Sequence, residues 1–221
     1  MSRRLRTTEV QRILVAMEKS LVSEEGDLVL LVDGKPLVVG SHSKDPDCEW
    51  GHARRGWAQG YKLHAIYGAD CVPQQWEVVP LNEAEPEVAA RLIPALGPGG
   101  GYVLGDSAYD SNPLHDATLA TGRQLVAKRK RPKAGLGHRR HSPGRLRSIT
   151  LLQGKFGQEL YALREGIERQ FGWLTNHGAG LAPLPNWVRR IHRVRLWVQT
   201  KLIIHATYVY LTSHPPPLAV A

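Results

Sequence analysis

The sequence has little cysteine and no long apolar run. Cys48 and Cys71 are its only cysteines in 221 residues, too few for a disulfide framework, so a reducing cytosol fits. The basic first residues are not followed by the apolar segment of a secretory signal peptide. The most apolar stretch, residues 194–212, contains Arg195 and Lys201, which argues against a membrane span. A small secreted scaffold and a membrane protein are therefore both disfavoured.

Acidic residues are fewer than basic ones. The chain has 29 Lys and Arg against 20 Asp and Glu, a net charge of +9. Such an excess favours polyanionic partners, of which nucleic acid is the commonest. A hydrophobic content of 42% and a charged content of 22% are ordinary for a globular protein. The length suits one substantial α/β domain with small additions.

Short apolar runs predict a mixed, five-stranded sheet flanked by helices. The predicted strands are residues 27–33, 61–67, 74–80, 102–106 and 124–127. The predicted helices are residues 7–21, 82–96, 112–121, 160–176 and 186–212. The second and third strands are close enough for an antiparallel hairpin, and helices separate the later strands as in parallel crossovers. Gly34 and Pro36 are expected to end the first strand, and Asn82 with Glu85 resembles a capping box.

Two further segments have a basic or aromatic character. Residues 128–147 hold nine Lys or Arg and almost no apolar residue, which predicts an exposed, mobile basic loop. Phosphate contact is favoured there over simple solvated charge. Trp50 and Trp57 lie near Arg54 and Arg55, a mixture that suits a nucleic acid strand, although covering a sheet edge explains the tryptophans equally well.

Three acidic residues stand at positions that allow them to meet. Asp33 and Asp106 each end an apolar run, and Glu168 lies on a later helix. Three adjacent carboxylates repel one another, a conflict that divalent cations resolve, and hard oxygen ligands suit Mg²⁺. Two such ions about 4 Å apart clamp a phosphodiester during in-line displacement. The simpler alternatives are a turn at Asp33 and a solvated helix face at Glu165 and Glu168. A zinc site of His42, Cys48 and His52 lacks a fourth ligand and is disfavoured.

The order and spacing of three motifs resemble a known family. The first is Tyr161, two residues, Arg164, three residues and Glu168; the second is residues 103–110 around Asp106; the third is residues 31–36 followed by residues 60–64. Together they resemble a bacterial insertion-sequence transposase of the DDE type, in the subgroup with the Tyr-x2-Arg-x3-Glu signature. The resemblance spans about residues 28–212.

The resemblance implies a ribonuclease-H-like fold and a DNA transposase that cleaves the ends of an insertion sequence and transfers strands. Asp33, Asp106 and Glu168 would be catalytic and would bind two Mg²⁺ ions, with Mn²⁺ as a substitute. The residues implied to contact DNA are Tyr161, Arg164, Arg169, Lys128, Arg129, Lys130 and Arg131. The expected partner is double-stranded DNA, both element ends and target, bound by a homodimer in the bacterial cytoplasm at the nucleoid, with no membrane.

The sequence departs from the family pattern in two places. Thr175 stands where the family usually has Lys, and only 32 residues precede Asp33, so a truncated copy is one expectation. The expected organisation is a short helical segment over residues 1–26, a catalytic domain over residues 27–212 with the basic loop, and a disordered tail over residues 213–221. A non-catalytic DNA-binding remnant and another ribonuclease-H-like nuclease are the alternative functions.

Overall fold

The computed structural model describes residues 7–22, 27–40, 43–53, 56–68, 72–138, 140–176 and 180–213. In this part of the chain the sheet has six strands, one more than predicted. They are β1 (Val29–Val38), β2 (Glu49–Ala53), β3 (Gly56–Tyr67), β4 (Pro73–Pro80), β5 (Tyr102–Gly105) and β6 (Gln124–Ala127). The order is β2-β3-β1-β5-β6, with β4 also paired to β3. β1, β5 and β6 are parallel, and the pairs of β3 with β1, β2 and β4 are antiparallel.

Two strand predictions were wrong. The first strand does not end after Asp33, because β1 continues to Val38 along β3, with Pro36 opposite Lys62. Beyond Leu31, β1 pairs with no described strand except β3, and an open edge of this kind tolerates proline. β2 was interpreted as irregular because it is short and polar, but it pairs with the first half of β3.

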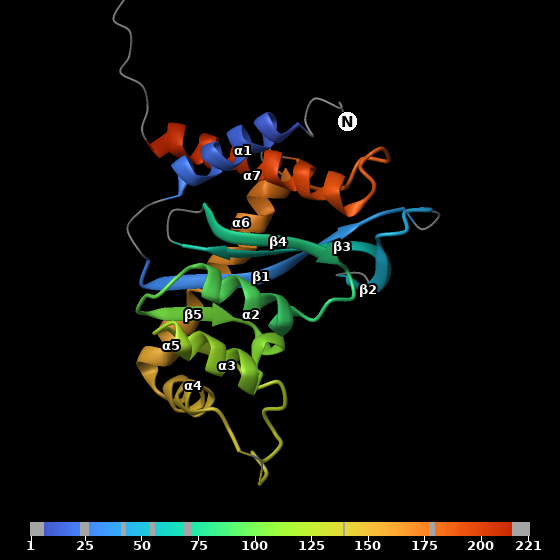
Figure 1. Cartoon of the computed structure of the whole chain (residues 1–221). Helices are drawn as coiled ribbons and strands as arrows, with labels where there is room; N and C mark the ends of the chain where they lie inside the picture. Colours follow the sequence, from blue (N-terminus) through green and yellow to red (C-terminus); the bar gives the residue numbers. More distant parts are fainter. Residues whose placement is uncertain are drawn as a thin grey trace, which may run out of the picture.

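Helices cover both faces of the sheet (Figure 1). They are α1 (Thr8–Leu21), α2 (Glu85–Ala95), the 3₁₀ helix η2 (Ser107–Tyr109), α3 (Asn112–Ala120), α4 (Pro143–Gln153), α5 (Lys155–Ala162), α6 (Glu165–Asn176) and α7 (Ile191–Ser213). Alternate residues of β1 serve two cores, as expected for a strand buried on both faces. Leu30 and Val32 pack in the core with residues of α2 and α3, whereas Leu31 and Leu37 pack in the core with residues of α6 and α7.

Three helical segments differ from the prediction. The predicted helix 160–176 is two helices, because α5 ends at Ala162 and α6 begins at Glu165. The last helix begins at Ile191 rather than near residue 186. α4 begins at Pro143, so the last residues of the predicted basic loop are helical. Ser213, the first residue of the predicted disordered tail, is instead the last residue of α7, and residues 214–221 lie outside the described residues.

The topology identifies the fold class. Without the short β2, the order β4-β3-β1-β5-β6 is an antiparallel three-stranded unit continued by two parallel strands. This mixed α/β sheet with helices on its faces is compatible with a ribonuclease-H-like fold, as predicted. No helix in the described ranges has the length and apolar character needed to cross a bilayer.

Candidate active site

Asp33 and Asp106 lie side by side on neighbouring parallel strands. Leu31 of β1 pairs with Leu104 of β5; Asp33 comes two residues after Leu31 on β1, and Asp106 is the first residue after the end of β5. Because side chains alternate along a strand, both carboxylates project from the face that carries Leu31 and Leu104, which is covered by α6. Asp33 Oδ1 accepts a hydrogen bond from the Gly34 N–H at 2.8 Å, and Asp106 Oδ1 accepts one from the Ala108 N–H at 2.7 Å.

The surroundings of Asp33 disfavour its ionised form. The pKa of Asp33 is raised from 3.8 to about 6, mainly by burial and to a lesser extent by the carboxylates of Asp106 and Glu85, while the Gly34 N–H and the Arg164 guanidinium act in the opposite direction. Burial also raises the pKa of Tyr109, a fully buried residue whose hydroxyl is near the same carboxylates. A nearby cation would therefore stabilise the ionised form of Asp33.

Two of the predicted DNA-binding cations stand beside these carboxylates. Val126 of β6 pairs with Leu104, so Lys128 follows β6 at the position next to Asp106. The Lys128 Nζ lies 4.8 Å from the centroid of the Tyr161 ring, and the Arg164 guanidinium carbon lies 5.9 Å from the same centroid. Tyr161 belongs to α5 and Arg164 to the connection before α6, not to one continuous helix as predicted. Arg164 lies close enough to Asp33 to oppose part of the rise in its pKa.

A cavity of about 730 Å³ opens beside Asp106. Its wall includes Ser107, Tyr161 and the first residues of the basic segment, Lys128, Arg129 and Lys130. Gln153 and Gln158 add polar groups, and Ile149 and Leu152 add apolar surface. Positive charge and an aromatic ring next to the carboxylates are features that suit a nucleic acid strand.

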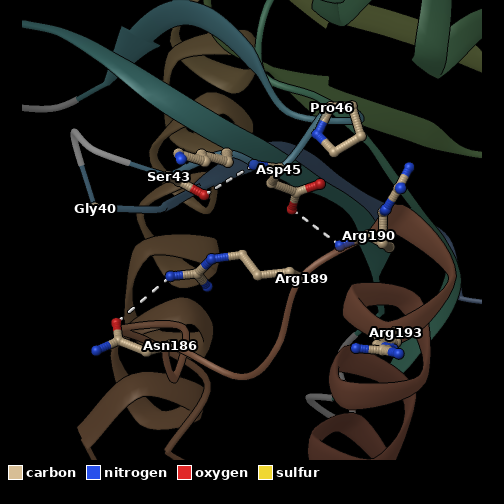
Figure 2. Close-up of a pocket in the computed structure, with 9 residues that line it drawn as sticks. Gly40, Ser43, Asp45, Pro46, Asn186, Arg189, Arg190 and Arg193 are labelled. Carbon is tan, nitrogen blue, oxygen red and sulfur yellow. Dashed lines mark hydrogen bonds between the residues drawn. The ribbon is translucent and has the colours of Figure 1, made fainter.

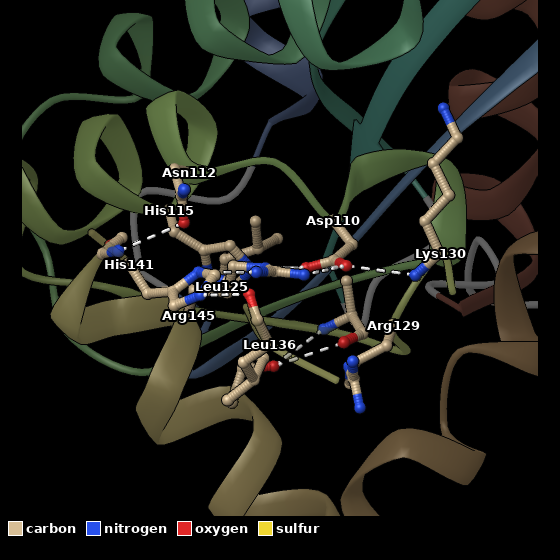
Figure 3. Close-up of polar contacts among 12 residues, drawn as sticks. Asp110, Asn112, His115, Leu125, Arg129, Lys130, Leu136, His141 and Arg145 are labelled. Atoms are coloured by element: carbon tan, nitrogen blue, oxygen red, sulfur yellow. Dashed lines mark hydrogen bonds and ion pairs between the residues drawn. The ribbon is translucent and has the colours of Figure 1, made fainter. Parts of the chain in front are cut away.

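The basic segment is exposed, but its two ends are fixed by hydrogen bonds (Figure 3). Asp110 accepts hydrogen bonds from Arg145 Nε at 2.6 Å and Nη2 at 2.7 Å, and from the Lys130 N–H at 3.0 Å. Asn112 Oδ1 accepts from the Ser142 N–H at 3.1 Å. Burial opposes ionisation of Asp110, but the hydrogen bonds from Arg145, His115 and Lys130 outweigh it and lower its pKa. The segment that carries Lys128, Arg129, Lys130 and Arg131 is thus tied to the loop that follows Asp106.

Glu168 is not gathered with the two aspartates. Its side chain is 69% exposed, and its Oε1 lies 3.7 Å from Arg164 Nη2. Ile167, one position earlier, is buried in the core, so residue 168 points about 100° away from it around the helix. Glu168 and the exposed Arg169 border a separate hollow of about 630 Å³. Among the described residues, no group of three or more His, Cys, Asp or Glu is placed to hold one metal ion.

Of the remaining residues singled out from the sequence, Thr175 is described by the structure and three others are not. Thr175, at the position of the family Lys, donates to the Phe171 carbonyl at 2.8 Å within α6. Arg54, Arg55 and the zinc candidate His42 lie outside the described residues.

Sequence reasoning missed the pair of Lys62 and Glu85 behind the site. The Lys62 Nζ lies 3.0 Å from Glu85 Oε1, and a Cβ added at Gly34 would lie 2.9 Å from Lys62 Cδ. Glu85 was interpreted as half of a capping box with Asn82, which was wrong: the N-cap of α2 is Ala84, without a side-chain cap. The sequence held one signal of this pair: Lys62 lies in the motif of residues 60–64, which follows the motif around Asp33.

A comparison with known families decides the classification. The family described as Transposase DDE domain matches residues 24–205. The chain belongs to this DDE transposase family. No curated protein and no solved structure matches the chain. DDE transposases act on DNA and generally use divalent metal ions. Asp33 and Asp106 fit such an ion, since they offer hard oxygen ligands on neighbouring strands and since the buried surroundings of Asp33 disfavour its charge in the absence of a cation.

Proposed function

We propose that this DDE transposase cleaves phosphodiester bonds at the ends of an insertion sequence and joins the freed ends to target DNA. The observation that carries the proposal is the register of β1 and β5, which sets Asp33 and Asp106 on one face beside the cations Lys128 and Arg164. Family membership supports the same chemistry.

The reaction has two in-line displacements. A water oxygen attacks the phosphorus at the element end, the bond from phosphorus to the 3′ oxygen breaks, and a free 3′-hydroxyl remains. That hydroxyl then attacks a target phosphorus, and the target strand's own 3′ oxygen leaves as a hydroxyl. Each displacement develops negative charge on the phosphoryl oxygens. Lys128 and Arg164 would bind those oxygens, and Arg164 offers a planar fork that suits two of them.

Asp33 and Asp106 would hold divalent metal, Mg²⁺ or Mn²⁺, with Glu168 as the third carboxylate and two ions in the full site. When bound, such ions polarise phosphoryl oxygens and lower the pKa of water. Tyr161, Arg169, Arg129, Lys130 and Arg131 would contact the DNA backbone near the cut. A homodimer would hold two element ends together.

A non-catalytic DNA-binding remnant is the second candidate. One observation favours it: the exposed position of Glu168, away from the two aspartates. This alternative needs the basic surface but no metal.

A cleavage assay separates the two functions. The whole chain is incubated with labelled duplexes that carry candidate terminal inverted repeats, with Mg²⁺ or Mn²⁺. We expect nicking at the repeat end, a loss of about 10³-fold or more in Asp106→Asn, and unchanged DNA affinity in that variant. Asp116→Asn, an exposed aspartate of α3, is the matched control. If the wild-type chain binds these duplexes but never cuts them, it is a non-catalytic DNA-binding remnant.

A further inference from the structure

β2 and the first half of β3 form a two-stranded ribbon with an exposed aromatic face. Trp50 pairs with Gln59 and His52 with Trp57, so the two tryptophans and His52 lie on one face. Trp50 is 52% and Trp57 68% exposed, and the His52 and Trp57 ring centroids are 4.8 Å apart. The other face is packed, because a Cβ at Gly51 would lie 2.5 Å from the Leu81 carbonyl oxygen. The core does not use these tryptophans.

The aromatic face looks to the same side of the sheet as Asp33. Asp33 pairs with Ala65, and the odd-numbered residues of β3 continue along that face through Leu63 and Tyr61 to Trp57. Eight residues of strand separate the level of Asp33 from Trp57, which at about 3.3 Å a residue is about 26 Å.

A basic groove lies at the base of the ribbon (Figure 2). Its volume is about 680 Å³, and its basic residues are Lys44, Arg189, Arg190 and Arg193. It adjoins the ribbon because Pro46, on its wall, is three residues before β2.

The aspartates near this groove are already engaged. The Asp45 carboxylate accepts from the Tyr61 hydroxyl at 2.7 Å and from the Arg190 N–H at 2.9 Å. Asp47 accepts from the Ile191 N–H at 3.0 Å and pairs with Arg190 at 3.2 Å. Within the described residues, Lys44, Arg189 and Arg193 form no ion pair, so the groove keeps a positive excess.

We propose that the ribbon and this groove form a second DNA-contact surface, separate from the candidate active site. The inference rests on the proposed function, since it assigns the surface to the duplex that is cut. Lys44 and Arg193 bind backbone phosphates, and the ribbon, which has the width that a major groove admits, packs its tryptophans on the DNA. A separation of about 26 Å corresponds to about 8 base pairs at about 3.4 Å each, so this contact falls within one helical turn of the cut.

The test measures DNA affinity by fluorescence anisotropy with two duplexes. One extends about 4 base pairs on each side of the outer end of the candidate terminal inverted repeat, and the other about 14. For the double variant Lys44→Gln/Arg193→Gln we expect at least 10-fold weaker binding of the long duplex and a salt slope lower by about 2, because two phosphate contacts are lost. Binding of the short duplex should not change. Trp57→Ala should weaken binding of the long duplex about 5-fold or more, which is in the range expected for the loss of one base or sugar contact.

Matched controls are Arg12→Gln on α1 and Tyr208→Ala on α7, both exposed and remote from the ribbon. Circular dichroism and melting temperature establish that each variant is folded. Equal affinity and salt slope for wild type and the double variant on the long duplex would overturn the inference. So would a change in oligomer mass, by light scattering, with DNA affinity unaltered, because the surface would then bind another copy. Because only binding is measured, this result is independent of whether the chain cuts DNA.

Discussion

Two pairs of aspartates in this molecule have opposite electrostatic surroundings. Asp45 and Asp47 accept hydrogen bonds from the first backbone N–H groups of α7 and from Arg190, and the Ile191 N–H is the main cause of the lowered pKa of Asp47. Asp33 and Asp106 instead lie at neighbouring positions of the sheet, and the pKa of Asp33 is raised. The charges of the first pair are stabilised by hydrogen bonds within the fold, whereas the surroundings of Asp33 in the second pair disfavour its ionised form. We therefore expect the end of the sheet that carries Asp33 and Asp106 to be the functional one.

The largest expected effect concerns the third carboxylate. Glu168→Gln should lower the cleavage rate about 10³-fold, or about 4 kcal/mol of transition-state stabilisation, if Glu168 joins Asp33 and Asp106 on DNA. Glu165→Gln, in the same first turn of α6, is the matched control and should cut normally. The measurement is single-turnover cleavage at saturating DNA. A reversed pattern would assign the third position to Glu165.

Replacing Asp110, whose charge is paired with Arg145, should lower the folding stability. The Asp110 side chain is 2% exposed and holds Arg145 with two hydrogen bonds. Asp110→Asn should lower the free energy of unfolding by about 3 kcal/mol, since it leaves a partly buried arginine without its anion. Urea denaturation measures the loss. A change below about 1 kcal/mol would show that the network of Figure 3 contributes little.

Replacing Asp33 with a neutral residue should instead raise the folding stability at neutral pH. The folded protein holds the Asp33 proton up to a pKa of about 6, against 3.8 ordinarily, so stability from this group is present below pH 4 and is lost as pH rises through 6. Without divalent ions, Asp33→Asn should therefore be more stable than wild type by about 2 kcal/mol at pH 7.5 and about equal at pH 4.

We expect Mg²⁺ to raise the melting temperature of the wild-type chain, and the same variant should lose this rise. Denaturation curves at pH 4, 5, 6 and 7.5, with Asp116→Asn as control, test both statements. If the unfolding free energies of wild type and Asp33→Asn changed with pH in parallel, the surroundings of Asp33 would not disfavour its ionised form.

The smallest effect is expected at the α7 cap. Asp47→Asn keeps an acceptor for the Ile191 N–H but loses the charge near the helix N-terminus, so stability should fall by about 1 kcal/mol. This difference should begin to shrink as pH falls below about 4, because the unfolded wild-type chain then binds a proton at Asp47, and it should vanish only below the lowered pKa of the folded protein. A difference that does not change at all between neutral and acid pH would indicate a packing effect instead.

Local patterns predicted the centre of the fold but not its connections. The apolar runs around Leu30, Leu104 and Val126 were long enough to mark strands, and the two run-ending aspartates could be placed at one edge. The break falls at Leu163 and Arg164, neither of which is Gly or Pro, and the apolar spacing continues across it, so the helical pattern did not predict the break.

Contacts between residues far apart in the sequence could not be predicted either. Basic residues near the start of the last helix indicated an anionic partner, but Asp45 and Asp47 lie more than 140 positions earlier in the chain. The salt bridge of Lys62 with Glu85 depends on how α2 crosses the sheet, which composition does not specify.

The uninterrupted length of β1 has a mechanical consequence. Because β1 passes Asp33 and continues beside β3 to Val38, the candidate cleavage point and the aromatic ribbon share one hydrogen-bonded unit of backbone. Their separation is then fixed by strand geometry and not by a hinge, so the sheet would serve as a ruler along the duplex. Lengthening β2 and β3 by two residues each should displace the protected base pairs while the cut stays in place.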